Sequence, residues 1–201
     1  MTQTPNAPPA SRDFVTLVSG LPRSGTSMLL QMLAAGGMEV LTDGVRAADD
    51  DNPRGYLEFE RVKSLKQDAS WVGKALGKAV KVIYYWLADL PPEYRYRVLF
   101  VRRDLDEVLA SQAAMLARRG TSDSTDDARM KKLFANELRE IDDWLIRHPT
   151  FSVLSVDYQA VVDQPLDQAR RINAFLGGRL DERAMAAAVD RSLYRNVSRK
   201  S

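Results

Sequence analysis

A short stretch near the start of the chain, SGLPRSGTSMLLQML at residues 19–33, has the residue types of an anion-binding loop. Gly20 and Gly25 are separated by four residues, as in the phosphate-binding loop G-x-x-x-x-G-K-[ST], but Thr26 stands where that loop carries its lysine. Such a loop, at the start of a helix, binds an anion through backbone N–H groups and the positive end of the helix dipole. The residues of this predicted site are Arg23, Ser24, Gly25, Thr26 and Ser27.

The missing lysine bears on which anion the loop holds. In nucleoside triphosphate sites that lysine steadies the β and γ phosphates, so a triphosphate is the weaker candidate here. Arg23 offers instead a planar guanidinium group suited to phosphate or sulfate oxygens, and Thr26 and Ser27 add hydroxyl donors. The alternative is an ordinary strand-to-helix turn capped by serine, but the full pattern favours an anion site.

A second candidate site lies in RVLFVRRDLDEVLASQ, residues 97–112. Arg103 follows a predicted strand, and Ser111 comes eight residues later, about two turns into the next predicted helix. These two side chains can converge on one phosphate at the edge where open α/β sheets bind ligands. A solvated arginine and a serine on the helix surface are the alternative.

Taken in order, these segments resemble the phosphate-binding segments of sulfotransferases that use 3′-phosphoadenosine 5′-phosphosulfate (PAPS). LPRSGTS, residues 21–27, resembles the 5′-phosphosulfate loop, and Arg103 with Ser111 has the spacing of the 3′-phosphate segment. DDNPRGYLEFERVKSL at 50–65 is similar to a segment of many microbial members, and VDYQAVVDQPLDQARRINAFLG at 156–177 to a late structural region. The resemblance implies a P-loop-type α/β fold, PAPS as donor and adenosine 3′,5′-bisphosphate (PAP) as product.

The resemblance also implies residues for the chemistry, in addition to Arg23. Lys81 holds the position of a family cation ahead of the 3′-phosphate strand, although Lys78 competes for this role and a surface lysine is the alternative. Some branches of the family use a histidine as base and others a glutamate. The single histidine, His148, lies far along the chain from the motif segments, so Glu58 is the predicted base, with an exposed helix glutamate as the alternative. Such a base needs a raised pKa, from burial or from a like-charged neighbour such as Glu60.

Hydrophobic patterning predicts the elements that position these residues. Apolar, β-rich runs at 14–19, 79–83, 97–101 and 151–156 alternate with helical patterns at 27–35, 104–118, 127–147, 163–176 and 181–189. Strands that alternate with helices form a parallel sheet covered on both faces. We therefore expect a single three-layer, P-loop NTPase-like α/β domain at residues 13–201, after a disordered tail at 1–12.

The acceptor depends on the loops of this domain. Two polar stretches, 42–56 and 120–128, are long enough to act as lids and to choose a small-molecule acceptor with a hydroxyl or amine group. The aromatic run at 84–86 can line an acceptor pocket, although a buried aromatic cluster is the stronger interpretation. Arg195 and Arg199 in the basic closing segment are possible helpers at the 3′-phosphate, with a frayed tail as the favoured alternative.

Composition excludes several classes of function. A net charge of +2 gives no general attraction to nucleic acid or to an anionic membrane. The absence of cysteine removes thiolate catalysis and cysteine-ligated zinc, and a single histidine excludes an all-histidine metal site. No apolar run reaches the roughly 18 residues of a membrane span and no secretory signal opens the chain, so we expect a cytoplasmic protein.

Two other functions stay open at this point. An ATP- and Mg²⁺-dependent phosphotransferase would need a replacement lysine and an acidic metal partner at a strand end, where Asp104 is available. A nucleotide-binding protein without turnover would need neither Glu58 nor Lys81. The acidic run at 49–51 lacks the spacing of a calcium loop, and the sulfotransferase interpretation requires no metal because arginine and lysine side chains replace Mg²⁺.

Overall fold

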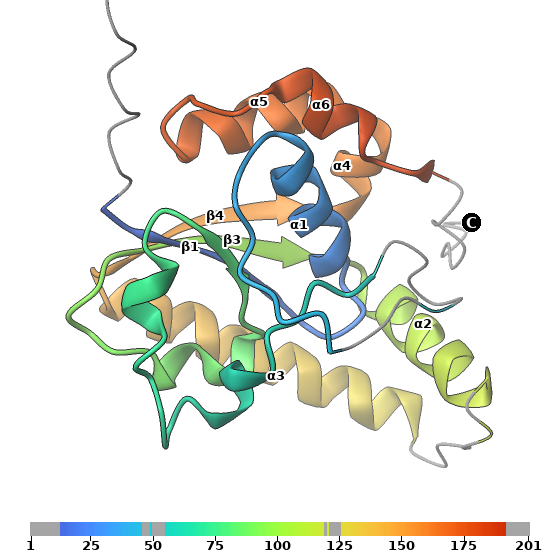
Figure 1. Ribbon diagram of the computed structural model, residues 1–201. Helices are drawn as coiled ribbons and strands as arrows, with labels where there is room; N and C mark the ends of the chain where they lie inside the picture. Colours follow the sequence, from blue (N-terminus) through green and yellow to red (C-terminus); the bar gives the residue numbers. More distant parts are fainter. Residues whose placement is uncertain (1–12, 46–48, 50–54, 119, 121–125, 192–201) are drawn as a thin grey trace, which may run out of the picture.

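The computed structural model describes residues 13–45, 49, 55–118, 120 and 126–191. At its centre is a parallel sheet with the strand order β2-β1-β3-β4 (Figure 1). The strands are β1 (Val15–Gly20), β2 (Ala79–Lys81), β3 (Tyr96–Arg102) and β4 (Phe151–Asp157). The α-helices are α1 (Thr26–Ala35), α2 (Leu105–Arg118), α3 (Asp127–Arg147), α4 (Tyr158–Asp163), α5 (Pro165–Phe175) and α6 (Glu182–Ala187). Short 3₁₀ helices are η1 (Glu60–Ser64), η2 (Val72–Ala75) and η3 (Tyr84–Asp89).

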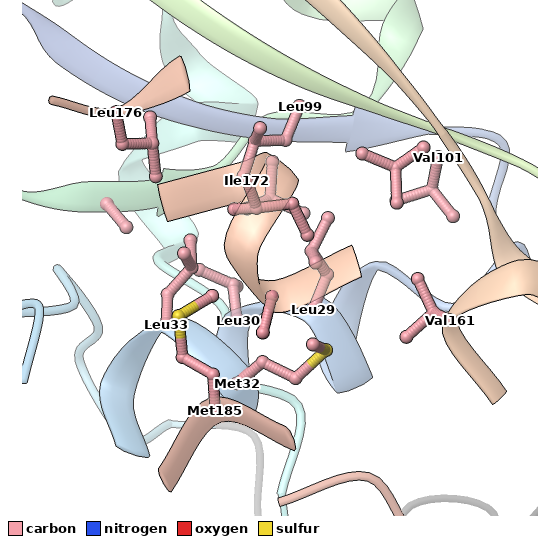
Figure 2. Close-up of a cluster of buried hydrophobic side chains, with 14 of the residues drawn as sticks. Leu29, Leu30, Met32, Leu33, Leu99, Val101, Val161, Ile172, Leu176 and Met185 are labelled. Carbon is pink, nitrogen blue, oxygen red and sulfur yellow. The ribbon is translucent and has the colours of Figure 1, made fainter. Parts of the chain in front are cut away.

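Helices cover both faces of the sheet, which confirms the predicted three layers. On one face, α1, α4, α5 and α6 lie together, and α3 lies on the other (Figure 1). Leu29 of α1 and Ile172 of α5 pack with Leu99 of β3 in the first core (Figure 2). Phe100 of β3 and Ile141 of α3 belong to the second core. Because both faces are buried, β1 and β3 are nearly continuous apolar runs.

The sequence analysis missed one short helix. The helix predicted at 163–176 is α5, and α4 precedes it. Asp157 begins α4, because its side chain accepts a hydrogen bond from the Ala160 amide. Pro165 then begins α5, since a proline fits the first turn of a helix but not its interior.

The strand order has a topological switch point at the carboxyl ends of β1 and β3. After β1 the chain continues to β2 on one side of β1, and it later forms β3 on the other side. The connections that follow β1 and β3 therefore run in opposite directions across the sheet. Gly20 at the end of β1 is in register with Val101 of β3. Open α/β sheets bind ligands at such a switch point, and the two predicted phosphate segments both begin here.

Parts of several predictions lie outside the described residues. These are the tail at 1–12, Arg195 and Arg199, and most of the two polar loops at 42–56 and 120–128. Of the helices that the structure describes, none has the length and apolar character needed to cross a membrane.

Candidate functional site

The loop after β1 is fitted closely against its neighbours. Gly20 has φ 144° and Gly25 has φ 105°, a region of backbone conformation that favours glycine. A Cβ atom on Gly25 would lie 2.4 Å from the ring of Tyr158, and one on Gly20 would lie 2.7 Å from the carbonyl oxygen of Val101. Both glycines are therefore required by the contacts of the loop with α4 and β3.

The start of α1 differs from the starts of α3, α4 and α6. Each of those three helices follows an aspartate whose side chain accepts backbone N–H hydrogen bonds. Helix α1 follows Gly25, which provides no side-chain cap, so the first amides of α1 can serve an anion. The buried hydroxyl groups of Ser19 and Ser24 have no hydrogen-bond partner, so the loop also holds unsatisfied polar atoms. These features fit an anionic ligand.

The two predicted phosphate segments meet at this loop. Arg103 Nη1 donates a hydrogen bond of 3.1 Å to the carbonyl oxygen of Arg23. Arg23 Nε in turn donates a hydrogen bond of 3.1 Å to Ser111 Oγ on α2. Residues 80 and 88 positions apart in the chain are thus joined directly.

Arg103 is held by two residues that the sequence analysis missed. Arg103 Nε and Glu107 Oε2 form an ion pair at 3.1 Å, and each side chain is 7% exposed. The guanidinium group of Arg103 also lies 4.4 Å from the centre of the Tyr158 ring. Burial raises the pKa of Tyr158, and Glu107 contributes to the rise, while Arg103 and Arg23 oppose it. The four-residue spacing could have indicated Glu107, but no signal marked Tyr158.

Positive charge is concentrated around Arg23. Burial lowers the pKa of Arg23, and the charges of Arg118 and Arg103 lower it further, while Tyr56 opposes these effects. An arginine remains charged in proteins despite such shifts, so several positive charges stay close together. Such a cluster favours a ligand with more than one anionic group.

Lys81 and Glu58 also meet, on the other side of the loop. Lys81 Nζ donates to Glu58 Oε1 at 3.1 Å, to Ser27 Oγ at 3.2 Å and to the carbonyl oxygen of Tyr56 at 3.1 Å. The alternative cation, Lys78, pairs instead with Glu39 at the surface. Glu58 is therefore paired with a cation, and Glu60, its predicted like-charged neighbour, pairs with Lys63.

Glu58 belongs to an extended segment that crosses the start of α1. Gln31 Nε2 donates to the carbonyl oxygen of Gly55 at 3.2 Å, and the Tyr56 hydroxyl donates to the carboxylate of Asp49 at 2.7 Å. Leu57 has φ 50°, a left-handed conformation that costs a residue of this type about 1–2 kcal/mol. Among the described non-glycine residues only Leu57 and Arg23 have positive φ, and both lie at this site. Backbone strain of this kind is often retained for function.

Three other candidates have structural roles. His148 stacks on Trp144 with ring centres 3.9 Å apart. It lies between α3 and the amino end of β4, whereas the loop lies at the carboxyl ends of the strands. Asp104 accepts backbone N–H groups at the start of α2, and the described residues hold no group of acidic and histidine side chains suited to a metal. The Tyr84 hydroxyl donates to Glu137 of α3 at 2.5 Å, whereas Tyr85 is 64% exposed.

Comparison with known protein families matches residues 15–201 to the sulfotransferase domain. The chain belongs to the sulfotransferase family. Family membership agrees with the meeting of the loop after β1 and the segment after β3, and it confirms the resemblance drawn from those two segments. A comparison with curated protein sequences finds no match.

Two solved structures of sulfotransferase domains are similar to this sulfotransferase domain. The domain from the Synechococcus PCC 7002 olefin synthase is 16% identical, with a TM-score of 0.53, over 91% of this chain and 81% of the other. The domain from the curacin biosynthetic pathway is 14% identical, with a TM-score of 0.52, over 91% of this chain and 90% of the other. These similarities show a shared P-loop NTPase-like fold, as predicted.

Proposed function

We propose that this sulfotransferase domain transfers a sulfuryl group from PAPS to a hydroxyl or amine group of a small-molecule acceptor. The observation that carries the proposal is the chain of hydrogen bonds from Arg103 through Arg23 to Ser111. It joins two arginines from the segments that follow the adjacent strands β1 and β3. PAPS carries two separate anionic groups, which need two such positions.

Each end of the donor has a set of residues suited to it. Arg103 and Ser111 hold the 3′-phosphate, and the loop from Arg23 to Ser27 holds the 5′-phosphosulfate. The unpartnered hydroxyl group of Ser24 and the uncapped start of α1 support this assignment, because each provides donors for anionic oxygens. Without the P-loop lysine, the loop is poorly suited to the β and γ phosphates of ATP.

The transfer itself is assigned to the other side of the loop. PAPS supplies an activated sulfuryl group: a bond forms between the acceptor atom and sulfur, the bond from sulfur to the bridging oxygen breaks, and the 5′-phosphate of PAP keeps that electron pair. Glu58 takes the proton that the acceptor loses. Lys81 and Arg23 stabilise the charge on the leaving oxygen and the sulfuryl oxygens, as Mg²⁺ does in kinases.

Calorimetric titration of the purified protein tests the donor assignment. We expect PAP to bind more tightly than adenosine 5′-monophosphate, which lacks the 3′-phosphate, and more tightly than ATP with Mg²⁺. Arg103→Ala should weaken PAP binding by about 10- to 100-fold, because it removes a charged hydrogen-bond donor. The matched control is Arg102→Ala, since Arg102 pairs with Asp142 of α3 and not with the loop.

The remaining outcomes would overturn parts of the proposal. Tight binding of ATP with Mg²⁺ and weak binding of PAP would indicate a phosphotransferase. If Arg103→Ala binds PAP as tightly as the wild type, the 3′-phosphate site lies elsewhere. Once an acceptor has been found by screening with PAPS, an unchanged turnover rate in Glu58→Gln would show that another group is the base.

A further inference from the structure

The ammonium group of Lys81 has an acceptor for each of its three protons. Ser27 Oγ lies at 3.2 Å, the carbonyl oxygen of Tyr56 at 3.1 Å and Glu58 Oε1 at 3.1 Å. The side chain of Lys81 is only 9% exposed, so it is held among these partners. An oxygen atom of a ligand can therefore reach this ammonium only by replacing one of the three acceptors.

Two of these acceptors also bind each other. The Tyr56 oxygen belongs to the backbone, and it accepts a hydrogen bond of 3.4 Å from the hydroxyl group of Ser27, in the first turn of α1. The Tyr56 oxygen cannot leave Lys81 without movement of its segment, and rotation of the Ser27 side chain away from Lys81 would break the hydrogen bond between the two.

Glu58 differs from both, because several rotatable bonds separate its carboxylate from the backbone. The side chain is 20% exposed, while its backbone carbonyl is anchored by Thr42 Oγ1 at 2.9 Å and by the Asp43 amide at 3.3 Å. Rotation of the side chain can thus release the carboxylate from Lys81 with the backbone in place. Glu58 is also the acceptor of the three that carries a charge.

The left-handed conformation of Leu57 explains how Glu58 reaches this position. Leu57 lies between Tyr56 and Glu58, and its φ of 50° turns the chain between them. The backbone oxygen before Leu57 and the side chain after it consequently contact the same ammonium. A carboxylate is thereby held beside the uncapped start of α1, where an anionic oxygen is favoured.

We propose that Glu58 occupies the place on Lys81 that an anionic oxygen of the donor takes. Donor binding displaces the carboxylate, which then becomes available to accept the proton of the acceptor. Glu58 thus competes with the donor for Lys81 and is also the base that donor binding releases. Because the base is released only when the donor binds, the donor binds before the acceptor. The inference rests on the proposed function, since it assumes a donor whose 5′ side reaches Lys81.

The test is a calorimetric comparison of PAP affinity among variants. Glu58→Gln keeps the shape of the side chain but removes its charge, so we expect PAP to bind about fivefold more tightly than to the wild type. Glu60→Gln is the matched control, because Glu60 pairs with Lys63 at the surface, and it should change the affinity by less than about twofold. Thermal unfolding of each variant checks that it is folded.

The same substitution in the Lys81→Ala variant distinguishes two explanations for tighter PAP binding: release of Lys81 by Glu58, and loss of repulsion between the Glu58 charge and PAP. In Lys81→Ala, the substitution Glu58→Gln should no longer tighten PAP binding, because the shared ammonium is absent. Equal tightening in both backgrounds, or no tightening in the wild-type background, would overturn the inference. Failure of the wild type to bind PAP would instead overturn the proposed function, so the two failures are distinguishable.

Discussion

The site has two halves that are built differently. The proposed donor half consists of Arg23, Arg103, Glu107, Ser111 and Tyr158, and the proposed reaction half consists of Ser27, Tyr56, Glu58 and Lys81. The ion pair of the donor half joins the segment after β3 to the first turn of α2, and both its side chains are 7% exposed. The pair of the reaction half joins a strand end to an extended segment, with exposures of 9% and 20%. A rigid half suits the binding of fixed anions, whereas a looser half suits groups that exchange partners.

The largest expected effect lies in the donor half, at Gly25. Gly25→Ala places a methyl group 2.4 Å from the buried ring of Tyr158 in a left-handed conformation. We expect the free energy of unfolding to fall by more than about 4 kcal/mol and PAP binding to be lost. Gly37→Ala is the control, since Gly37 has φ 90° but open space around it, and it should cost only about 1–2 kcal/mol. If chemical denaturation gave equal losses of unfolding free energy for Gly25→Ala and Gly37→Ala, the Tyr158 ring would move away from the new methyl group at little cost.

The next effect compares the two ion pairs. Glu107→Ala leaves the guanidinium group of Arg103 buried without its carboxylate, so we expect a loss of about 3 kcal/mol in the free energy of unfolding. Glu58→Ala removes a partner from the more exposed pair and should cost about 1 kcal/mol. Urea denaturation measures both values. Similar losses would mean that the two halves do not differ in rigidity.

A smaller effect tests the strained backbone of the reaction half. Leu57→Ile conserves volume but adds a β-branch, which disfavours the left-handed conformation. We expect it to lower the free energy of unfolding by about 1–2 kcal/mol relative to Leu57→Met, which is unbranched. PAP binding should not weaken in either variant, because the donor half is unchanged and the Glu58 carboxylate only competes with the donor. Equal free energies of unfolding for Leu57→Ile and Leu57→Met would show that the segment accommodates a β-branched residue without strain.

The smallest effect concerns pH in the donor half. Burial raises the pKa of Tyr158, so its phenol stays neutral up to and beyond about pH 10, and Arg23 stays charged. The contribution of the neutral phenol to stability is present below about pH 10 and is lost as the pH rises through its raised pKa. PAP affinity should therefore change by less than about twofold between pH 7.5 and 9. A larger change, measured by calorimetry, would reveal a titrating group in this half.

The two halves also differ in how far the sequence predicts them. The strands were predicted because buried parallel strands are apolar runs. The sequence also named Arg103 and Ser111, but it did not predict that both would contact Arg23. The sequence also named Lys81 and Glu58. It did not predict that Tyr56 and Glu58 both accept hydrogen bonds from the Lys81 ammonium, because this arrangement depends on the left-handed conformation of Leu57.

Tyr158 was missed for a different reason. It contacts the loop because α4 begins directly after β4, and that boundary depends on the cap at Asp157. The late segment that contains it reads as structural in the sequence. In the structure, Tyr158 also explains why position 25 must be glycine.

The central position of β1 in the sheet has a consequence for synthesis. This strand is made first, but its partners β2 and β3 follow much later in the chain. At about 5–20 residues per second on the ribosome, the nascent strand waits several seconds for β3. The bond between Arg23 and Ser111 spans 88 residues, and contacts of such separation form slowly. The nascent protein thus exposes, for the longest time, a strand that is buried along its whole length in the folded domain, which makes this interval the one in which a chaperone would be most useful.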